Sequence, residues 1–208
     1  MIVAFINQKG GSGKSTLAVH AAAWLVARGR SVGFIDADAQ QTSGQWMAEA
    51  LPAVPVVRAH SIGAITDAAR DLAGRVEVIV ADGPAGLDEG TIALAGVADR
   101  VIVPCCPGVA DLRAARNVVE MLGRVQSKRG AGVPAAVLVM NRVRRNTRLS
   151  ADVISAAPAL GLPVAVATVG LRDALADACG QGSHVFAMGT GAAQAAEELA
   201  ALFTEVFA

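Results

Sequence analysis

The sequence predicts an α/β fold in which a mostly parallel, doubly wound sheet carries helices on both faces. Short apolar runs rich in valine and isoleucine alternate with helical patterns along the 208 residues. The first run, residues 2–7, leads directly into a glycine-rich loop and then into a helix that begins at about Lys14. The hydrophobic content of 53% is enough, in a chain of this length, to bury one large core. We therefore expect a single domain, residues 1–208.

Each apolar run is expected to form one strand of the sheet. The runs cover residues 2–7, 31–36, 54–59, 76–81, 100–104, 135–140 and 163–168. Continuous apolar runs of this length are typical of parallel strands, because helices bury both of their faces. Between the runs, Gly29 is expected to end the first helix, residues 130–134 form a turn, and Gly161 with Pro163 leads into the last strand.

The loop at residues 9–15, K-G-G-S-G-K-S, is the strongest chemical signal in the chain. Small residues let backbone N–H groups turn inward around phosphate, and the positive end of the helix dipole strengthens the anion site. Lys14 would reach the β- and γ-phosphates of a nucleotide, and Ser15 would bind Mg²⁺. The other predicted nucleotide contacts of the loop are Gly10, Gly11, Ser12, Gly13 and Thr16. The common loop pattern has a glycine in place of Gln8, so this is a variant form, and a turn with incidental lysines is the alternative interpretation.

Three aspartates lie at or just beyond the carboxyl ends of predicted strands. They are Asp36, Asp38 and Asp82. Because parallel strands bring their carboxyl ends to one edge of the sheet, we expect these carboxylates to gather near the nucleotide. One of Asp36 and Asp38 has the alternative role of capping the helix that follows.

Three motifs together resemble the ParA/MinD group of deviant Walker P-loop ATPases. They are N-Q-K-G-G-S-G-K-S-T at residues 7–16, D-A-D-A-Q at residues 36–40 and D-G-P at residues 82–84. Their order and spacing match the family, and the similarity covers nearly all of the chain. It is greatest to the short ParA proteins that position plasmids or other cargo. The first predicted strand starts at residue 2, so no N-terminal DNA-binding extension is expected.

The resemblance implies ATP and Mg²⁺ as cofactors and assigns roles to individual residues. Lys9 would be the signature lysine that crosses a nucleotide-sandwich homodimer to the phosphates of the partner subunit; its alternative is a contact with the nucleotide of its own subunit. Asp38 would orient the attacking water, Asp36 would support Ser15 and the Mg²⁺ shell, and Asp82 would hold Mg²⁺ as the Walker B aspartate.

Two residues differ from those usual in related sequences, and they affect the expected rate of ATP hydrolysis and the expected switch loops. Gly83 stands where many P-loop ATPases have a catalytic glutamate, so hydrolysis is expected to be slow. Stimulation of hydrolysis by a partner is what the resemblance to ParA proteins implies. Ala39 replaces the proline of the first switch, which should loosen that loop without changing the chemistry. Residues 83–86 would form the second switch, and residues 104–111 are expected to provide packing and to face a partner.

The base of the nucleotide is expected to lie between two segments late in the chain. Asn141 ends a predicted strand and resembles the family asparagine that meets the adenine edge, with a turn-capping role as the alternative. Residues 169–172, including Arg172, would form the loop on the other side of the ring.

The formal net charge is zero, but residues 105–148 carry nine basic and two acidic side chains. Within this block, Arg142, Arg144, Arg145 and Arg148 are the predicted DNA-binding residues. No aromatic residue is interleaved with them, which favours sequence-independent phosphate contacts that weaken steeply with salt. An ordinary solvated basic face is the alternative.

Other features limit the class of protein. No apolar stretch is long enough to span a membrane, and no basic segment of the signal-peptide type precedes the first strand. Cys105, Cys106 and Cys179 lack metal-ligand or disulfide spacing and are expected to be small core residues. No pair of the three histidines has a metal-site or triad spacing. We expect a cytoplasmic, nucleoid-associated protein that does not bind membranes.

The favoured function is a ParA-like positioning ATPase. Its ATP-bound homodimer would bind DNA nonspecifically, and a ParB-like or other adaptor protein would stimulate hydrolysis, as in plasmid partition. A MinD-like membrane switch is one alternative, but it needs a basic C-terminal helix and this terminus carries Glu197, Glu198 and Glu205. A metabolic or electron-transfer relative, of the dethiobiotin-synthetase or nitrogenase-iron-protein type, is the other. The sequence does not identify the cargo.

Overall fold

The computed structural model describes residues 1–130, 132–144 and 147–208. Its described strands form one six-stranded sheet in the order β3-β2-β4-β1-β5-β6, and every strand pair is parallel. The strands are β1 (Ile2–Asn7), β2 (Val32–Asp36), β3 (Val56–Arg58), β4 (Val78–Ala85), β5 (Arg100–Cys105) and β6 (Ala135–Met140). The α-helices are α1 (Lys14–Val26), α2 (Thr42–Ala50), α3 (Ile62–Ala73), α4 (Glu89–Val97), α5 (Val109–Arg129), α6 (Arg148–Ala156), α7 (Asp173–Gly180) and α8 (Ala193–Val206). The described residues also form three short 3-10 helices, η1 (Ala157–Leu160), η2 (Val185–Ala187) and η3 (Thr190–Ala192).

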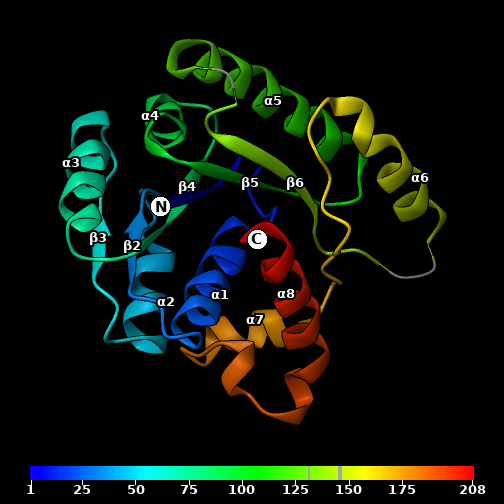
Figure 1. Ribbon diagram of the computed structural model, residues 1–208. Coiled ribbons are helices and arrows are strands. Elements are labelled where there is room, and N and C mark those ends of the chain that lie inside the picture. The colour runs from blue at the N-terminus through cyan, green and yellow to red at the C-terminus, as the bar shows by residue number, and fades with distance from the viewer. Residues whose placement is uncertain (131, 145–146) are drawn as a thin grey trace.

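Helices cover both faces of the sheet, so the predicted fold class is confirmed. One hydrophobic core joins the sheet to α1, α2, α7 and α8, and a second joins it to α3, α4, α5 and α6 (Figure 1). Alternation along β1 divides the two cores, since Val3 and Phe5 belong to the first and Ala4 and Ile6 to the second. β1 lies between β4 and β5, and the loop that follows it therefore emerges at the middle of the sheet edge.

The first helix begins and ends as the sequence predicts. α1 starts at Lys14, directly after Gly13, whose φ of 95° lies in the left-handed region that favours glycine. After Val26 the chain turns through Gly29 at φ 75°, and the Arg30 amide donates to the Leu25 carbonyl at 3.2 Å. This is a glycine-closed helix end.

The predicted strand at 163–168 is wrong. The segment runs beside β6 and makes a single parallel bridge, Leu138 to Val164. The amides of Val166 and Ala167 donate instead to the Glu205 carboxylate of α8, at 2.7 and 2.9 Å. The Ala165 amide still donates to the Leu138 carbonyl at 2.9 Å, but the next amide that would face β6, that of Ala167, donates to a side chain instead, and the ladder stops.

β4 also differs from the prediction, because it continues four residues past Ala81. After a register shift in β1, Asn7 pairs with Ala85, which draws most of the predicted second switch into the sheet. Gly83 allows this close pairing, since a Cβ there would lie 2.8 Å from the Phe5 carbonyl oxygen. β3 is shorter than predicted, and the remaining predicted strands agree to within one residue.

No helix among the described residues is long and apolar enough to cross a membrane. The three cysteines are free; Cys105 is buried, and Cys106 and Cys179 are half-buried.

Candidate nucleotide site

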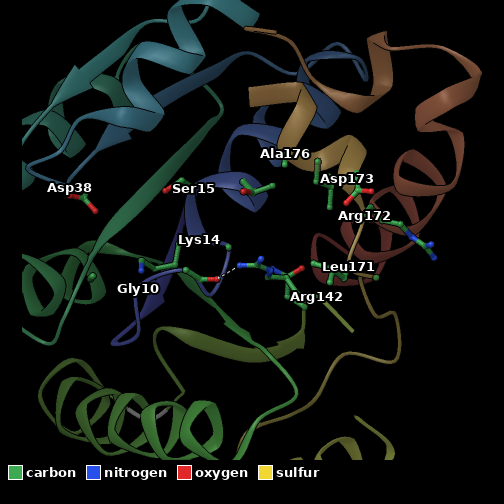
Figure 2. A pocket seen from close by; sticks show the side chains of 16 residues that line it. Gly10, Lys14, Ser15, Asp38, Arg142, Leu171, Arg172, Asp173 and Ala176 are labelled. Carbon is green, nitrogen blue, oxygen red and sulfur yellow. Dashed lines mark hydrogen bonds between the residues drawn. The ribbon is translucent and has the colours of Figure 1, made fainter. Parts of the chain in front are cut away.

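A cavity of about 420 Å³ opens at the carboxyl edge of the sheet, within the size range of small-molecule sites. It is lined by the glycine-rich loop, the start of α1, Asp38, Ala85, Asn141, Arg142 and the segment from Gly170 to Ala176. Figure 2 shows Asp38, Lys14 and Ser15 toward one end of the cavity and Leu171, Arg172 and Asp173 toward the other. Residues predicted from four separate parts of the sequence therefore meet around one space.

The loop lysine Lys14 points into the cavity region and is buried. Its Nζ donates to the Lys9 carbonyl oxygen at 3.4 Å. Burial lowers the pKa of the Lys14 ammonium, and the negative charges of Asp82 and Asp38 oppose this shift. A phosphate group would supply the negative partner that a buried ammonium needs.

Two side chains from the end of β6 brace the loop. Asn141 is buried, and its Nδ2 donates to the Ser12 carbonyl oxygen at 2.8 Å. The approach is so close that a Cβ on Gly13 would lie 2.1 Å from that Nδ2. Arg142, itself at φ 56°, donates to the Gly11 carbonyl oxygen at 3.0 Å, the contact drawn as a dashed line in Figure 2.

Asp82 is fully buried on β4 near Lys14 and Ser15, and neither of its carboxylate oxygens has a hydrogen-bond partner among the described residues. Burial raises the pKa of this carboxyl to about 7; the hydroxyls of Ser15 and Ser43 lie near it and oppose the rise, without completing a hydrogen bond to it. An unpartnered buried carboxylate beside a serine hydroxyl fits a hard cation such as Mg²⁺, which binds oxygen ligands and takes others from water and phosphate.

The two aspartates of the first switch have different surroundings. Asp36 is buried, and its two oxygens accept from the amides of Asp38 at 3.0 Å and Gly44 at 2.7 Å. Because Gly44 lies in the first turn of α2, Asp36 occupies the helix-capping role that was its alternative interpretation. Asp38 is half-buried and lines the cavity, with one oxygen accepting from the Gln40 amide at 2.9 Å. Asp38 alone of this pair faces the nucleotide space.

Lys9 faces away from the cavity. Its Nζ lies 2.8 Å from Oδ2 of Asp111, in the first turn of α5, and the side chains are 44% and 10% exposed. The pair raises the pKa of the Lys9 ammonium, chiefly through this hydrogen bond. The loop thus presents one lysine to its own cavity and the other to the surface.

Arg172 comes from the predicted base loop, yet its guanidinium is engaged elsewhere. It forms a bidentate pair with Glu198 of α8, at 2.6 Å for Nη2 to Oε1 and 3.3 Å for Nε to Oε2. In Figure 2 its side chain points away from Lys14 and Ser15. The backbone around Arg172 lines the cavity while the charged group is tied to another helix.

The predicted DNA-binding arginines are divided by the structure. Arg142 lies in the nucleotide cavity, whereas Arg144 and Arg148 are exposed on the loop before α6 and on its first turn. Arg145 lies outside the described residues. Four more basic side chains, Arg113, Arg116, Arg124 and Lys128, are exposed along α5, and no ion pair holds any of them within the described part of the chain.

Sequence reasoning missed the partners of these groups. The segment containing Asp111 was expected to face a partner, but the pairing of its carboxylate with Lys9 was not predicted. Glu198 carried no signal beyond its contribution to an acidic terminus. Both contacts join residues far apart in the chain, 102 and 26 positions respectively.

The sequence matches the family model described as CobQ/CobB/MinD/ParA nucleotide binding domain over residues 3–185. A relative from Halothiobacillus neapolitanus, maintenance of carboxysome distribution protein A, is 31% identical over 212 residues, covering 98% of this chain and 95% of the relative. Among solved structures, apo McdA from Cyanothece is similar with a TM-score of 0.80 at 14% identity, covering 100% of this chain and 99% of that one. MinD from Pyrococcus horikoshii, solved with Mg-ADP, is similar with a TM-score of 0.68 at 19% identity, covering 96% and 94%. These structures share the fold described above.

Proposed function

This chain belongs to the CobQ/CobB/MinD/ParA nucleotide-binding family, as its motifs predict, and we propose that it is an ATP-driven dimerising switch that positions an intracellular cargo. Residues 1–208 would act as one ATPase domain. ATP and Mg²⁺ would be its cofactors, and the product of its reaction would be ADP and phosphate.

The chemistry assigned to the site follows from the placement of its groups. The loop amides and Lys14 would bind the phosphates, with Ser15 and Asp82 holding Mg²⁺, which would neutralise charge on the phosphate oxygens. Asp38 would orient the attacking water, because it is the carboxylate of the first switch that lines the cavity. Asp36 would act on the metal shell indirectly, by fixing the loop that carries Asp38.

The observation that carries the proposal is the opposite orientation of the two loop lysines. Lys14 is buried beside the cavity, whereas Lys9 is paired with Asp111 outside it. A contact of Lys9 with the nucleotide of its own subunit is therefore disfavoured. A facing subunit would bring its own phosphates to this exposed lysine, which supports hydrolysis in a nucleotide-sandwich homodimer.

Nonspecific DNA is the proposed surface on which the dimer moves. Arg144 and Arg148 are exposed just before α6 and on its first turn, and α5 carries exposed basic residues from Arg113 to Lys128. At 1.5 Å per residue this stripe is roughly 22 Å long, enough to follow several phosphates. The protein would then be cytoplasmic and nucleoid-associated.

A partner protein is proposed to stimulate hydrolysis and to link the switch to its cargo. Gly83, in place of a catalytic glutamate, supports a slow intrinsic rate that an adaptor, ParB-like or of another type, would raise. The named relative maintains carboxysome distribution, so a large protein assembly is as suitable a cargo as a plasmid.

Sedimentation with duplex DNA of mixed sequence tests the proposal. The purified protein is spun with ATP or ADP, with and without DNA, at two salt concentrations. We expect dimers and DNA binding with ATP only, and weaker binding at high salt. Equal DNA binding with ATP, ADP and no nucleotide would contradict the switch.

A further inference from the structure

We propose that Glu198 and Arg172 form an anchor through which helix α8 positions the base-side wall of the nucleotide cavity and so sets the affinity for ATP and the choice of base. Both are positioning residues, since neither needs to touch the nucleotide. The inference rests on the proposed function in one respect, that the wild-type protein binds ATP in this cavity.

The Glu198 carboxylate holds the 170–172 segment at two places. It accepts from the Gly170 amide at 2.9 Å and from the Arg172 guanidinium at 2.6 and 3.3 Å. The two side chains are only 13% and 22% exposed, so water competes weakly for the pair. A backbone amide and a side chain two residues apart are thereby fixed to one carboxylate.

Gly170 shows how tightly the anchor is packed. A Cβ at this position would lie 2.8 Å from Nε of Arg172 and 3.0 Å from its Cζ. The guanidinium therefore folds back over the backbone of its own loop, and a larger residue than glycine at this position would have to displace it.

The anchored segment is connected to the phosphate loop through the end of β6. The Val143 amide donates to the Val169 carbonyl at 2.9 Å, and the Leu171 amide donates to the Val143 carbonyl at 3.0 Å. The residues just before Val143 are Asn141 and Arg142, which bind carbonyls of the phosphate loop. Glu198 thus stands at one end of a continuous chain of contacts.

The anchored wall is the part of the cavity left for base and ribose. The glycine-rich loop at the other end, with the start of α1, Asp38 and Ala85, takes the phosphates, and the remaining lining comes from Asn141, Arg142 and the segment from Gly170 to Ala176. Figure 2 shows Leu171 and Asp173 on the side of the cavity away from Asp38. Loosening this wall would weaken contacts to the base more than contacts to the phosphates.

The alternative, a direct contact of Arg172 with the base, requires the guanidinium to leave Glu198 and turn toward the cavity. The two models differ in what Glu198 does. In the anchor model its removal weakens ATP binding, whereas in the contact model its removal frees Arg172 and leaves ATP binding intact or stronger.

The test variants are Glu198→Ala, Arg172→Ala and the double variant that carries both changes. The control is Glu197→Ala, which removes an exposed glutamate from the neighbouring position of the same helix. Affinities for MgATP and MgGTP are measured by calorimetry. Inhibition of ATP hydrolysis by tripolyphosphate, which has no base, measures phosphate binding alone. The kcat for ATP hydrolysis is measured at saturating ATP. Glu198→Gln and Arg172→Lys, which keep part of the contact, serve if an alanine variant does not fold.

The anchor predicts about tenfold weaker ATP binding in each alanine variant and little further loss in the double variant. The preference for ATP over GTP falls, while tripolyphosphate inhibition and kcat change by less than about twofold. Glu197→Ala behaves as wild type, and the glutamine and lysine variants fall between. Wild-type ATP affinity in Glu198→Ala, or equal losses for ATP and tripolyphosphate, overturns the anchor. A wild-type protein that binds ATP without dimerising would instead contradict the proposed function and leave the anchor intact.

Discussion

At the scale of single residues, the two lysines of the glycine-rich loop show that side-chain orientation decides which partners a residue meets. Lys9 and Lys14 belong to one short loop, yet one is exposed and paired with Asp111 while the other is buried beside Asp82. The sequence predicted a functional role for both residues. It did not give their directions, because these depend on α5 and β4, which pack against the loop from distant parts of the chain.

Removing the Lys9 charge should abolish ATP-dependent dimerisation while leaving MgATP binding intact. We expect Lys9→Ala to bind MgATP as wild type, because the cavity lining is unchanged, but neither to dimerise on ATP nor to hydrolyse it. Analytical ultracentrifugation with ATP and a phosphate-release assay measure the two effects. Asp111→Asn is the matched variant: it keeps the lysine and removes its partner, and the dimer should form at roughly threefold lower protein concentration. ATP-dependent dimerisation of Lys9→Ala would contradict the trans role.

Asp38 should be required for turnover and dispensable for binding. Its half-buried carboxylate lines the cavity and has one oxygen free of the Gln40 amide. We expect Asp38→Ala to lower the rate of ATP hydrolysis by at least about a hundredfold while ATP affinity stays within about threefold of wild type. Asp67→Ala, a change at an exposed aspartate of α3, is the control. Normal hydrolysis by Asp38→Ala would remove this residue from the mechanism.

His20 should make the protein sensitive to acid. Its ring is buried, with Nδ1 at 2.7 Å from the Thr16 carbonyl and Nε2 accepting from the Val185 amide, and burial lowers its pKa to about 4. As the pH falls, His20 therefore takes up a proton in the unfolded chain before it does so in the folded chain. The contribution of neutral His20 to the free energy of unfolding is complete above about pH 6.5 and is lost as the pH falls toward 4. The loss amounts to about 3 kcal/mol in the free energy of unfolding.

Urea titrations between pH 7 and pH 4 measure this contribution. His20→Gln should lack the corresponding pH dependence, whatever its absolute stability, whereas His60→Gln, at an exposed histidine, should keep it. Parallel curves for wild type and His20→Gln would show that the histidine does not titrate as described.

At the scale of elements, hydrophobic runs predicted the sheet well where backbone pairing alone decides the outcome. Six of the seven predicted strands exist, and α1 starts at the predicted residue. The failures come from tertiary contacts: Glu205 takes amides from the 163–168 segment, and Gly83 lets β4 continue against β1. A period-2 or apolar pattern contains no information about a distant carboxylate or a close backbone approach.

Glu205 should hold the 163–168 segment on the sheet. Its carboxylate accepts from the amides of Val166 and Ala167, and the Val166 side chain is 90% exposed, so these hydrogen bonds add to the packing of Ala165 and to the backbone bonds with Leu138. We expect Glu205→Ala to lower the free energy of unfolding by about 1 kcal/mol and to speed hydrogen exchange at these two amides. The same change at Glu197 should alter stability by less than about 0.5 kcal/mol. Unchanged exchange at both amides would count against this role.

At the scale of the whole molecule, the phosphate end of the site was predictable and the rest was only partly so. The glycine-rich loop and Asp38 follow strands and Asp82 lies within β4, so the rule that parallel strands end at one edge was enough to predict that these residues gather there. Arg142, by contrast, belongs to a basic cluster in the sequence but reaches Gly11 in the structure. Composition indicates how much charge a segment carries, and tertiary structure decides which side it faces.

The exposed basic residues should make DNA binding depend on salt in proportion to the phosphates they contact. We expect the double variant Arg144→Ala with Arg148→Ala to weaken binding of the ATP-bound protein to mixed-sequence duplex DNA and to lower the slope of log affinity against log salt by about 1.8. Fluorescence anisotropy at several salt concentrations measures the slope. Arg70→Ala, at an exposed arginine of α3, is the control. An unchanged slope in the double variant would place DNA on another surface.

The Lys9–Asp111 pair has a consequence for how the protein would behave as its concentration changes. Under the proposed trans role, each subunit holds in a neutral pair the charge that its neighbour needs for hydrolysis. An isolated subunit would then retain its nucleotide, and below the dimerisation constant the rate of hydrolysis would rise with the square of protein concentration. At low concentration the protein would keep its ATP, and at high local concentration it would hydrolyse it, so the local density of the protein would set the lifetime of its ATP-bound state.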